Sequence, residues 1–136
     1  MKKILIFLTS LLLVGCLTLT ESSSSNITVT YLVKNSSYDT EWTVIVYKDV
    51  LGSIEEELLM KPGESWVKTL NFRLPEYGSE HLALAAHSLY GTFETTISVN
   101  DINQSVSSGS RLKTNGREYL SLSQLFIDRD KLRRYQ

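Results

Sequence analysis

Apolar and polar residues alternate along most of the chain from residue 26 onward. Successive side chains of a β-strand point to opposite faces, so this alternation predicts strands. Turn clusters rich in Gly, Pro, Asn, Asp and Ser interrupt the pattern and divide 26–127 into seven or eight short strands. The pattern favours an all-β protein, an antiparallel sandwich of two sheets, with a small closed β-barrel as the alternative.

Three segments indicate which faces their strands turn toward the core. Apolar residues occupy every second position from Ile27 to Val33 and form one face of the first strand. The segment from Trp42 to Tyr47 is apolar on both faces, which favours a central position in a sheet. In the third segment Glu55 and Glu57 point away from the apolar face, and charged residues of this kind are typical of an edge strand.

Turn residues mark several connections between the strands. Lys61-Pro62-Gly63-Glu64 has Pro and Gly at the positions that a type II turn prefers. Asn100-Asp101 predicts a hairpin turn, Asn115-Gly116 another turn, and residues 107–110 a Ser-rich loop.

Residues 80–90 allow two interpretations. Leucines and alanines there fall at helical spacing, and alanine favours a helix. The same residues also alternate as a strand would, with small alanines suited to tight packing in a central position. A strand is favoured, because Gly91 and the neighbouring strands leave little room for a helix.

The first residues of the chain predict a secretory signal. A short positive region at 1–3 precedes an apolar stretch of about 11 residues, too short for a helix to span a bilayer, which needs about 20. The stretch ends in Leu13-Val14-Gly15-Cys16, which resembles the bacterial lipobox at all four positions. The resemblance implies cleavage between Gly15 and Cys16 and attachment of lipid to the Cys16 thiol.

These features divide the chain into four parts: a signal peptide at 1–15, a lipidated Cys16 with a Ser-rich tether at 16–25, a sandwich domain at 26–127 and a charged tail at 128–136. The lipid on Cys16 makes the membrane a partner and anchors the protein in the cell envelope. Because residue 17 is Leu rather than Asp, the outer membrane is favoured if the host is Gram-negative.

Charge and cysteine content narrow the classes of function. The net charge is −1 for the 136 residues, and removal of two lysines with the signal lowers it to about −3. Nucleic acid binding requires a basic face, so no nucleic acid partner is expected. Cys16 is the single cysteine, so the domain contains no internal disulfide and depends on its apolar core.

The order of strand motifs resembles a known family. It runs through Val29-Thr30-Tyr31-Leu32-Val33, then Trp66, then Thr96-Ile97-Ser98-Val99-Asn100-Asp101. Over about 60% of the chain this resembles small Bacteroidetes-type lipoproteins whose domain is similar to the mycobacterial membrane-transport accessory proteins (MmpS-like). The sequence departs from that pattern where Pro62-Gly63 precedes Trp66 and where the hairpin lacks a glycine. The resemblance implies an immunoglobulin-like sandwich with an accessory role and supplies no catalytic residues.

No grouping of residues in the sequence indicates catalysis. His81 and His87 would lie on one face of a strand about 20 Å apart, too far to share a metal. The Glu55-Glu56-Glu57 run suggests paired carboxylates, but alternation sends its outer two members to one solvent face. The thiol of Cys16 is committed to lipid, and no G-x-S-x-G motif occurs. We therefore expect no enzyme, no catalytic residues, no metal and no cofactor.

Aromatic residues are the remaining candidates for binding. Trp42 and Trp66 are expected in the core, as most tryptophans of a small sandwich are. Tyr77 and Tyr90 lie beside turns and are the possible ligand-facing residues. The sequence favours a non-enzymatic envelope lipoprotein that binds or supports another envelope protein. The alternative is a surface-exposed glycan- or peptide-binding module, and a small hydrolase, which needs converging polar side chains, is a third hypothesis.

Overall fold

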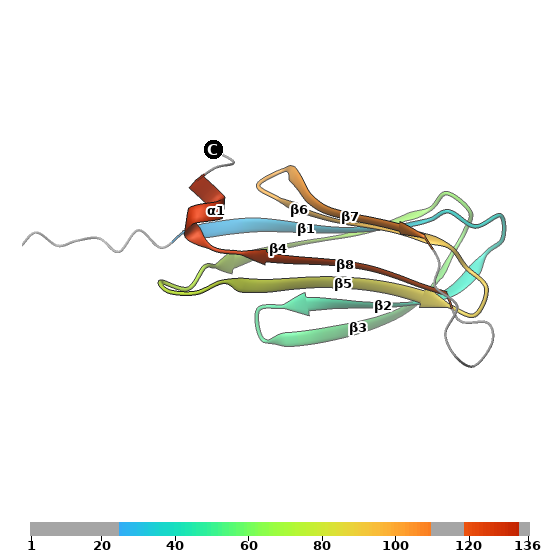
Figure 1. Ribbon diagram of the computed structural model, residues 1–136. Coiled ribbons are helices and arrows are strands. Elements are labelled where there is room, and N and C mark those ends of the chain that lie inside the picture. The colour runs from blue at the N-terminus through green and yellow to red at the C-terminus, as the bar shows by residue number, and fades with distance from the viewer. Residues whose placement is uncertain (1–24, 110–118, 134–136) are drawn as a thin grey trace, which may run out of the picture.

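The computed structural model describes residues 25–109 and 119–133, which form two stacked antiparallel sheets (Figure 1). Sheet A has the order β4 (Ser65–Arg73), β1 (Asn26–Asn35), β6 (Phe93–Val99) and β7 (Ile102–Gly109). Sheet B has the order β3 (Gly52–Met60), β2 (Glu41–Asp49), β5 (Glu80–Ser88) and β8 (Tyr119–Ile127). The prediction of an antiparallel sandwich is confirmed, and the two sheets do not close into the alternative barrel.

The chain crosses repeatedly between the two sheets. β1 pairs with β4 as strand B pairs with strand E in an immunoglobulin domain, and β2 pairs with β5 as strand C pairs with strand F. β1 also pairs with β6, and β2 also pairs with β3. β6 takes the place beside β1 that strand A holds in that fold, and β8 pairs with β5 where strand G would. The second strand is central and the Glu-bearing third strand is an edge, as the sequence predicted.

The core lies between the inner faces of the four central strands. Alternate residues from Ile27 to Val33 are fully buried, and they meet inward-facing residues of β2, β5 and β6. Tyr31 and Tyr47 pack with ring centroids 5.7 Å apart, and the Tyr31 hydroxyl donates to the Lys48 carbonyl oxygen at 2.8 Å. Burial raises the pKa of Tyr31 far above the ordinary tyrosine value, so this hydroxyl stays protonated.

Several turns have the predicted chemistry. Gly63 has a φ of 74°, and the Glu64 amide donates to the Lys61 carbonyl at 3.0 Å, as a type II turn requires. Asn100 and Asp101 have φ values of 49° and 65°, the left-handed pair of a type I′ hairpin between β6 and β7. Residues 80–88 form β5, so the strand interpretation of this segment is confirmed.

The predicted loop at 107–110 is wrong over its first three residues. β7 continues to Gly109, where it pairs with Phe93 of β6. An edge strand is held by backbone hydrogen bonds to one neighbour, so it forms here without the apolar alternation that marks the other strands. Ser110 and the Asn115-Gly116 turn lie outside the described residues, as do the signal peptide, Gly15 and Cys16.

The charged tail forms one short helix. α1 (Arg129–Arg133) follows β8 directly, and the Asp128 carboxylate accepts a hydrogen bond from the Lys131 amide at 2.7 Å. Such a bond caps the first turn of a helix. Leu132 is buried against the core, which fixes the tail to the sandwich.

A buried cluster of hydroxyl groups joins the two sheets between β6 and β8. The Thr95 hydroxyl lies 2.8 Å from the Ser123 hydroxyl and 3.2 Å from that of Ser121. Ser123 also donates to the Thr95 carbonyl at 2.8 Å. All three residues are buried, so these hydrogen bonds replace the water that the hydroxyl groups lose on folding.

Replacing Thr95 by Val is expected to lower the free energy of unfolding by about 1–3 kcal/mol, because hydroxyl groups of β8 lose a buried partner. The measurement is urea denaturation. Thr30→Val is the matched control, since Thr30 shares an exposed hydrogen bond with Thr69 on the outer face of the same sheet. Equal unfolding midpoints for the two variants would contradict a stabilising role for this cluster.

Candidate binding surface

The outer face of sheet A is largely polar. Hydroxyl and amide groups bond to one another across its strands: Thr28 to Asn71 at 3.1 Å, Thr30 to Thr69 at 3.2 Å, and Ser98 to Asn103 at 2.6 Å. Val67 (55%) and Val106 (58%) are its exposed apolar side chains. Such a face is compatible with direct contact with water.

The outer face of sheet B carries larger apolar side chains, with Glu55 and Glu57 at its β3 edge. Five large side chains lie exposed on it: Trp42 (59%), Leu59 (57%), Leu89 (62%), Leu122 (42%) and Phe126 (52%). We call these five residues the apolar outer face. Half-buried Val44, Val46, Ala83 and Ala85 fill the middle of the same surface. Exposed apolar patches of this extent on a small domain mark interaction sites more often than ordinary surface.

The register of the strands makes this surface continuous. Trp42 of β2 pairs with Leu59 of β3, and Leu122 of β8 pairs with Ala85 of β5. Near the other end of β8, the Phe126 ring stacks on the His81 ring with centroids 4.4 Å apart. The five residues therefore lie on all four strands of sheet B or beside them, within one surface.

A small depression of about 150 Å³ lies beside Trp42. It is lined by Trp42, Val44, His87, Ser88 and Leu89. Its walls come from β2 and from the end of β5, two strands that the register places side by side. A single side chain would fill it, whereas a metabolite needs a cavity of roughly 300 Å³ or more.

Tyr77 and Tyr90, the possible ligand-facing residues, are both exposed but do not come together. Tyr77 precedes β5 and Tyr90 follows it, so about 30 Å of strand separates them. They cannot line one small-molecule site, and the aromatic cluster that a glycan-binding module was expected to show near both residues is not formed.

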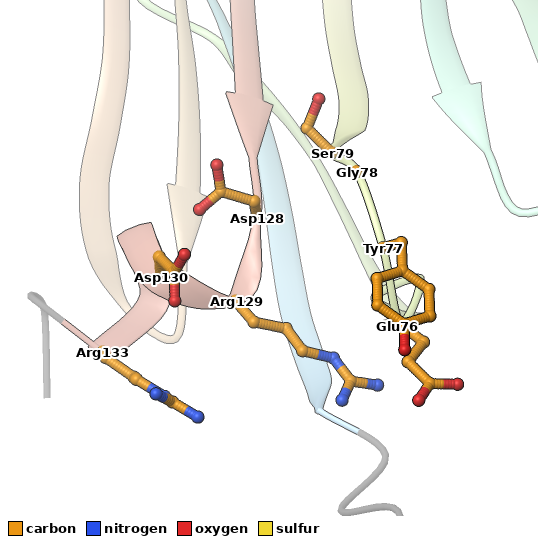
Figure 2. Close-up of a pocket in the computed structure, with 8 residues that line it drawn as sticks. All are labelled: Glu76, Tyr77, Gly78, Ser79, Asp128, Arg129, Asp130 and Arg133. Atoms are coloured by element: carbon orange, nitrogen blue, oxygen red, sulfur yellow. The ribbon is translucent and has the colours of Figure 1, made fainter.

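Tyr77 lies instead in an open depression of about 580 Å³ between the β4–β5 loop and α1 (Figure 2). Its walls carry both signs of charge: Asp128, Arg129, Asp130 and Arg133 come from α1 and the residue before it, and Glu76 from the β4–β5 loop. The Arg129 side chain extends toward Glu76 and Tyr77 (Figure 2). α1 and the β4–β5 loop, which line the depression, lie at the end of the sandwich where the chain enters β1 (Figure 1).

The expectation that both tryptophans are core residues is wrong for Trp42. Thr43, Ile45 and Tyr47 of β2 turn inward, so Trp42 projects from the outer face of the sheet. Trp66 is half-buried at the margin of the core. The sequence contained a signal for this outward position, since the strand from Trp42 to Tyr47 is apolar on both faces. One face of every strand in a two-layer sandwich points outward, so some of these apolar residues had to be exposed.

Glu56 is the centre of a polar cluster that joins the sheets on the side opposite β7 and β8. Its carboxylate accepts hydrogen bonds from the Tyr47 hydroxyl at 2.8 Å and from Trp66 Nε1 at 3.1 Å. Lys68 Nζ lies 3.6 Å from the same carboxylate. The hydrogen bond from Tyr47 contributes most to lowering the pKa of Glu56, and the hydrogen bond from Trp66 and the positive charge of Lys68 lower it further. These effects outweigh partial burial, which raises the pKa. Both carboxylate oxygens are engaged, which indicates a structural role.

Other kinds of site were sought among the described residues. In 25–109 and 119–133 no three His, Cys, Asp or Glu side chains gather to hold a metal. His81 and His87 both lie on the outer side of β5, as the sequence predicted. Within the same ranges no helix has the length and apolar content needed to cross a membrane.

Comparison with known proteins adds no assignment. No protein-family model matches the chain, and no curated protein matches it either. The resemblance to MmpS-like lipoproteins therefore stays a prediction, and the structure by itself carries the argument for a binding surface.

Replacing Glu56 by Gln is expected to remove a stabilising contribution that depends on pH. Because the pKa of Glu56 is lowered by folding, the ionised carboxylate stabilises the fold above about pH 4.5, and the effect is lost as the pH falls below that value. At pH 7 the free energy of unfolding of the wild-type chain should exceed that of Glu56→Gln by about 1 kcal/mol or less, since the cluster is partly exposed. Near pH 3 the two free energies of unfolding should be equal.

Urea denaturation at the two pH values measures this difference. Glu55→Gln is the control, because the exposed Glu55 side chain points away from the cluster. A difference between wild type and Glu56→Gln that stays the same at both pH values would contradict the role assigned to the carboxylate.

Proposed function

We propose that this chain is a non-enzymatic, lipid-anchored lipoprotein of the cell envelope, an accessory or structural domain that binds another envelope protein through the apolar outer face. The observation that carries the proposal is the contrast between the two outer faces of one sandwich. Hydroxyl and amide groups predominate on sheet A, where Val67 and Val106 are exposed, whereas five large apolar side chains, an indole and a phenyl ring among them, lie exposed on sheet B. A face that is apolar like the centre of a protein interface is stabilised when a partner covers it.

The proposed membrane anchor joins the sandwich at one end of its strands. Nine residues lie between Cys16, the proposed lipid site, and Asn26 at the start of β1. Such a tether spans at most about 35 Å when extended. β1 begins at the end of the sandwich that holds α1 (Figure 1), so the proposed tether joins the domain at that end and leaves sheet B open to a partner.

A protein partner fits this surface better than a glycan. Sugar sites combine an aromatic platform with several polar groups that bond to hydroxyls, and the middle of this surface is made of Val44, Val46, Ala83 and Ala85. Among the described residues, the exposed Trp42 ring beside the 150 Å³ depression favours the glycan- or peptide-binding alternative.

Cross-linking in native membranes followed by capture of the chain tests the proposal. Mass spectrometry should find an acylated N-terminal peptide that begins at Cys16, together with one envelope protein in stoichiometric amount. Trp42→Lys should lose that protein, because a charge is placed in the contact. Val67→Lys should retain it, since Val67 has a similar exposure of 55% but lies on the outer side of β4 in sheet A.

Two results would contradict the proposal in different ways. An unmodified peptide that begins elsewhere would remove the lipid anchor. Equal capture by both lysine variants would mean that the apolar outer face is not the binding surface. An acylated chain that captures no protein, and that binds a glycan array in a Trp42-dependent manner, would support the alternative module.

A further inference from the structure

We infer that the depression at Tyr77 binds the headgroup of a membrane phospholipid, a phosphate ester that also carries an ammonium group. This gives a ligand to a site outside the apolar outer face, and for the source of that ligand it rests on the lipid anchor of the proposed function. An unpaired guanidinium group, the charges around it and the place of the depression in the fold carry the inference.

The guanidinium group of Arg129 lacks a partner. Its Nε atom is buried, and no atom of the described residues accepts a hydrogen bond from it. Within 25–109 and 119–133 the Arg129 side chain forms no ion pair either. The group extends toward Glu76 and Tyr77, on the other side of the depression (Figure 2). Buried donors are nearly always hydrogen-bonded in folded proteins, so this atom favours an acceptor oxygen supplied by a ligand.

Arg133 brings a second guanidinium group to the same depression. Arg129 and Arg133 are the two ends of α1, and residues four apart in a helix lie on one face, one turn from each other. Two like charges at this spacing repel each other, and an anion bound between them removes the repulsion. The N–H donors of a guanidinium group match the oxygens of a phosphate group, so the pair favours a phosphate ester.

Three carboxylates give the depression a second preference. Glu76, Asp128 and Asp130 line it together with two arginines, which leaves one negative charge in excess. A purely anionic ligand would be repelled by these carboxylates. A ligand with a phosphate and an ammonium group satisfies both signs, since ammonium donates hydrogen bonds to carboxylate oxygens. With about 580 Å³, the depression has room for a headgroup of this kind.

The place of the depression favours a lipid over a soluble metabolite. α1 and the β4–β5 loop lie at the end of the sandwich where the chain enters β1 (Figure 1). The proposed tether joins the domain there and holds this end within about 35 Å of the membrane surface. A bilayer presents phosphate esters at high density, so even a weak site is occupied beside it. Tyr77 is 85% exposed on the loop, and tyrosine is typical of surfaces that lie at the level of lipid headgroups.

The test titrates the acylated chain, purified from membranes into an uncharged sugar detergent, with soluble headgroups. NMR of the chain with isotope-labelled arginine reads the Nε–H signal of Arg129, which Arg129→Lys identifies by its loss. Glycerophosphoethanolamine should shift this signal in a saturable manner. Three probes should bind about tenfold more weakly or less, because each lacks one of the two charged groups or the ester: glycerophosphoglycerol, ethanolamine and inorganic phosphate.

Two variants distinguish a specific site from general attraction between charges. Arg129→Gln should weaken the binding of glycerophosphoethanolamine, read through the Arg133 signal, by about tenfold or more. Arg73→Gln is the matched control, because it removes the same charge from an exposed arginine outside the depression, at the end of β4 beside Asn26. Binding to this control should be unchanged. Thermal unfolding of each variant establishes that it is folded.

A second measurement tests the source of the ligand. The acylated chain is placed in vesicles of a neutral galactolipid, with or without phosphatidylethanolamine. Oxidation of Tyr77 by hydroxyl radicals should be lower in the vesicles that contain phosphatidylethanolamine, because a bound headgroup covers the ring. Tyr38 is 99% exposed in the turn that follows β1, at the opposite end of the sandwich, and should be oxidised equally in both.

The outcomes separate this inference from the proposed function. An Arg129 signal that does not respond, in a chain that is acylated and captures an envelope protein, would overturn the inference and leave the proposed function intact. A response in a chain that proves unmodified at Cys16 would support the site and overturn the lipid anchor.

Two further results would overturn the inference. Equal weakening by Arg129→Gln and Arg73→Gln would reduce the binding to general attraction between charges. Inorganic phosphate that binds as tightly as glycerophosphoethanolamine, with equal oxidation of Tyr77 in the two kinds of vesicle, would make a soluble phosphate the ligand in place of a lipid.

Discussion

Burial of one face of every strand between two sheets is the constraint on which this structure depends. The ladder from Ile27 to Val33, the inward residues of β2 and β5, and the inner face of β6 form a single apolar layer. Because side chains alternate along a strand, each sheet also acquires an outer face that the core does not use. Sheet A carries mainly threonine, serine and asparagine there, with two exposed valines, and sheet B carries tryptophan, leucine and phenylalanine. The proposed function follows from this difference.

Two polar clusters close the sides of the core. Between β6 and β8 the hydroxyl groups of Thr95, Ser121 and Ser123 bond to one another across the sheets. On the opposite side the Glu56 carboxylate accepts hydrogen bonds from the Tyr47 hydroxyl and from Trp66 Nε1. Hydrogen bonds have directions, so these clusters fix how the sheets sit on one another more strictly than apolar packing does. The outer faces are held in constant shape as a result, which a docking surface requires.

The sequence predicted most of the strands because their signals are local. Alternation from Ile27 onward, Pro62-Gly63 and Asn100-Asp101 each depend on a few neighbouring residues. Strand pairing is not local, which explains the wrong loop at 107–109 and the wrong placement of Trp42. A strand that is apolar on both faces can turn either one inward, and its neighbours in space decide which. The exposure of Tyr77 and Tyr90 followed from nearby turns, but their separation follows from β5 lying between them.

The central claim is that the apolar outer face is covered when the protein is at its membrane. Hydroxyl-radical footprinting read by mass spectrometry tests it directly, by comparing oxidation of Trp42 in native membranes with that in a dilute soluble form lacking Cys16. The account predicts strong protection of Trp42 in membranes, with Val67, which is 55% exposed on the outer side of sheet A, oxidised equally in both forms. Equal oxidation of Trp42 in the two forms would contradict the account, because the face would then be open to water in the envelope.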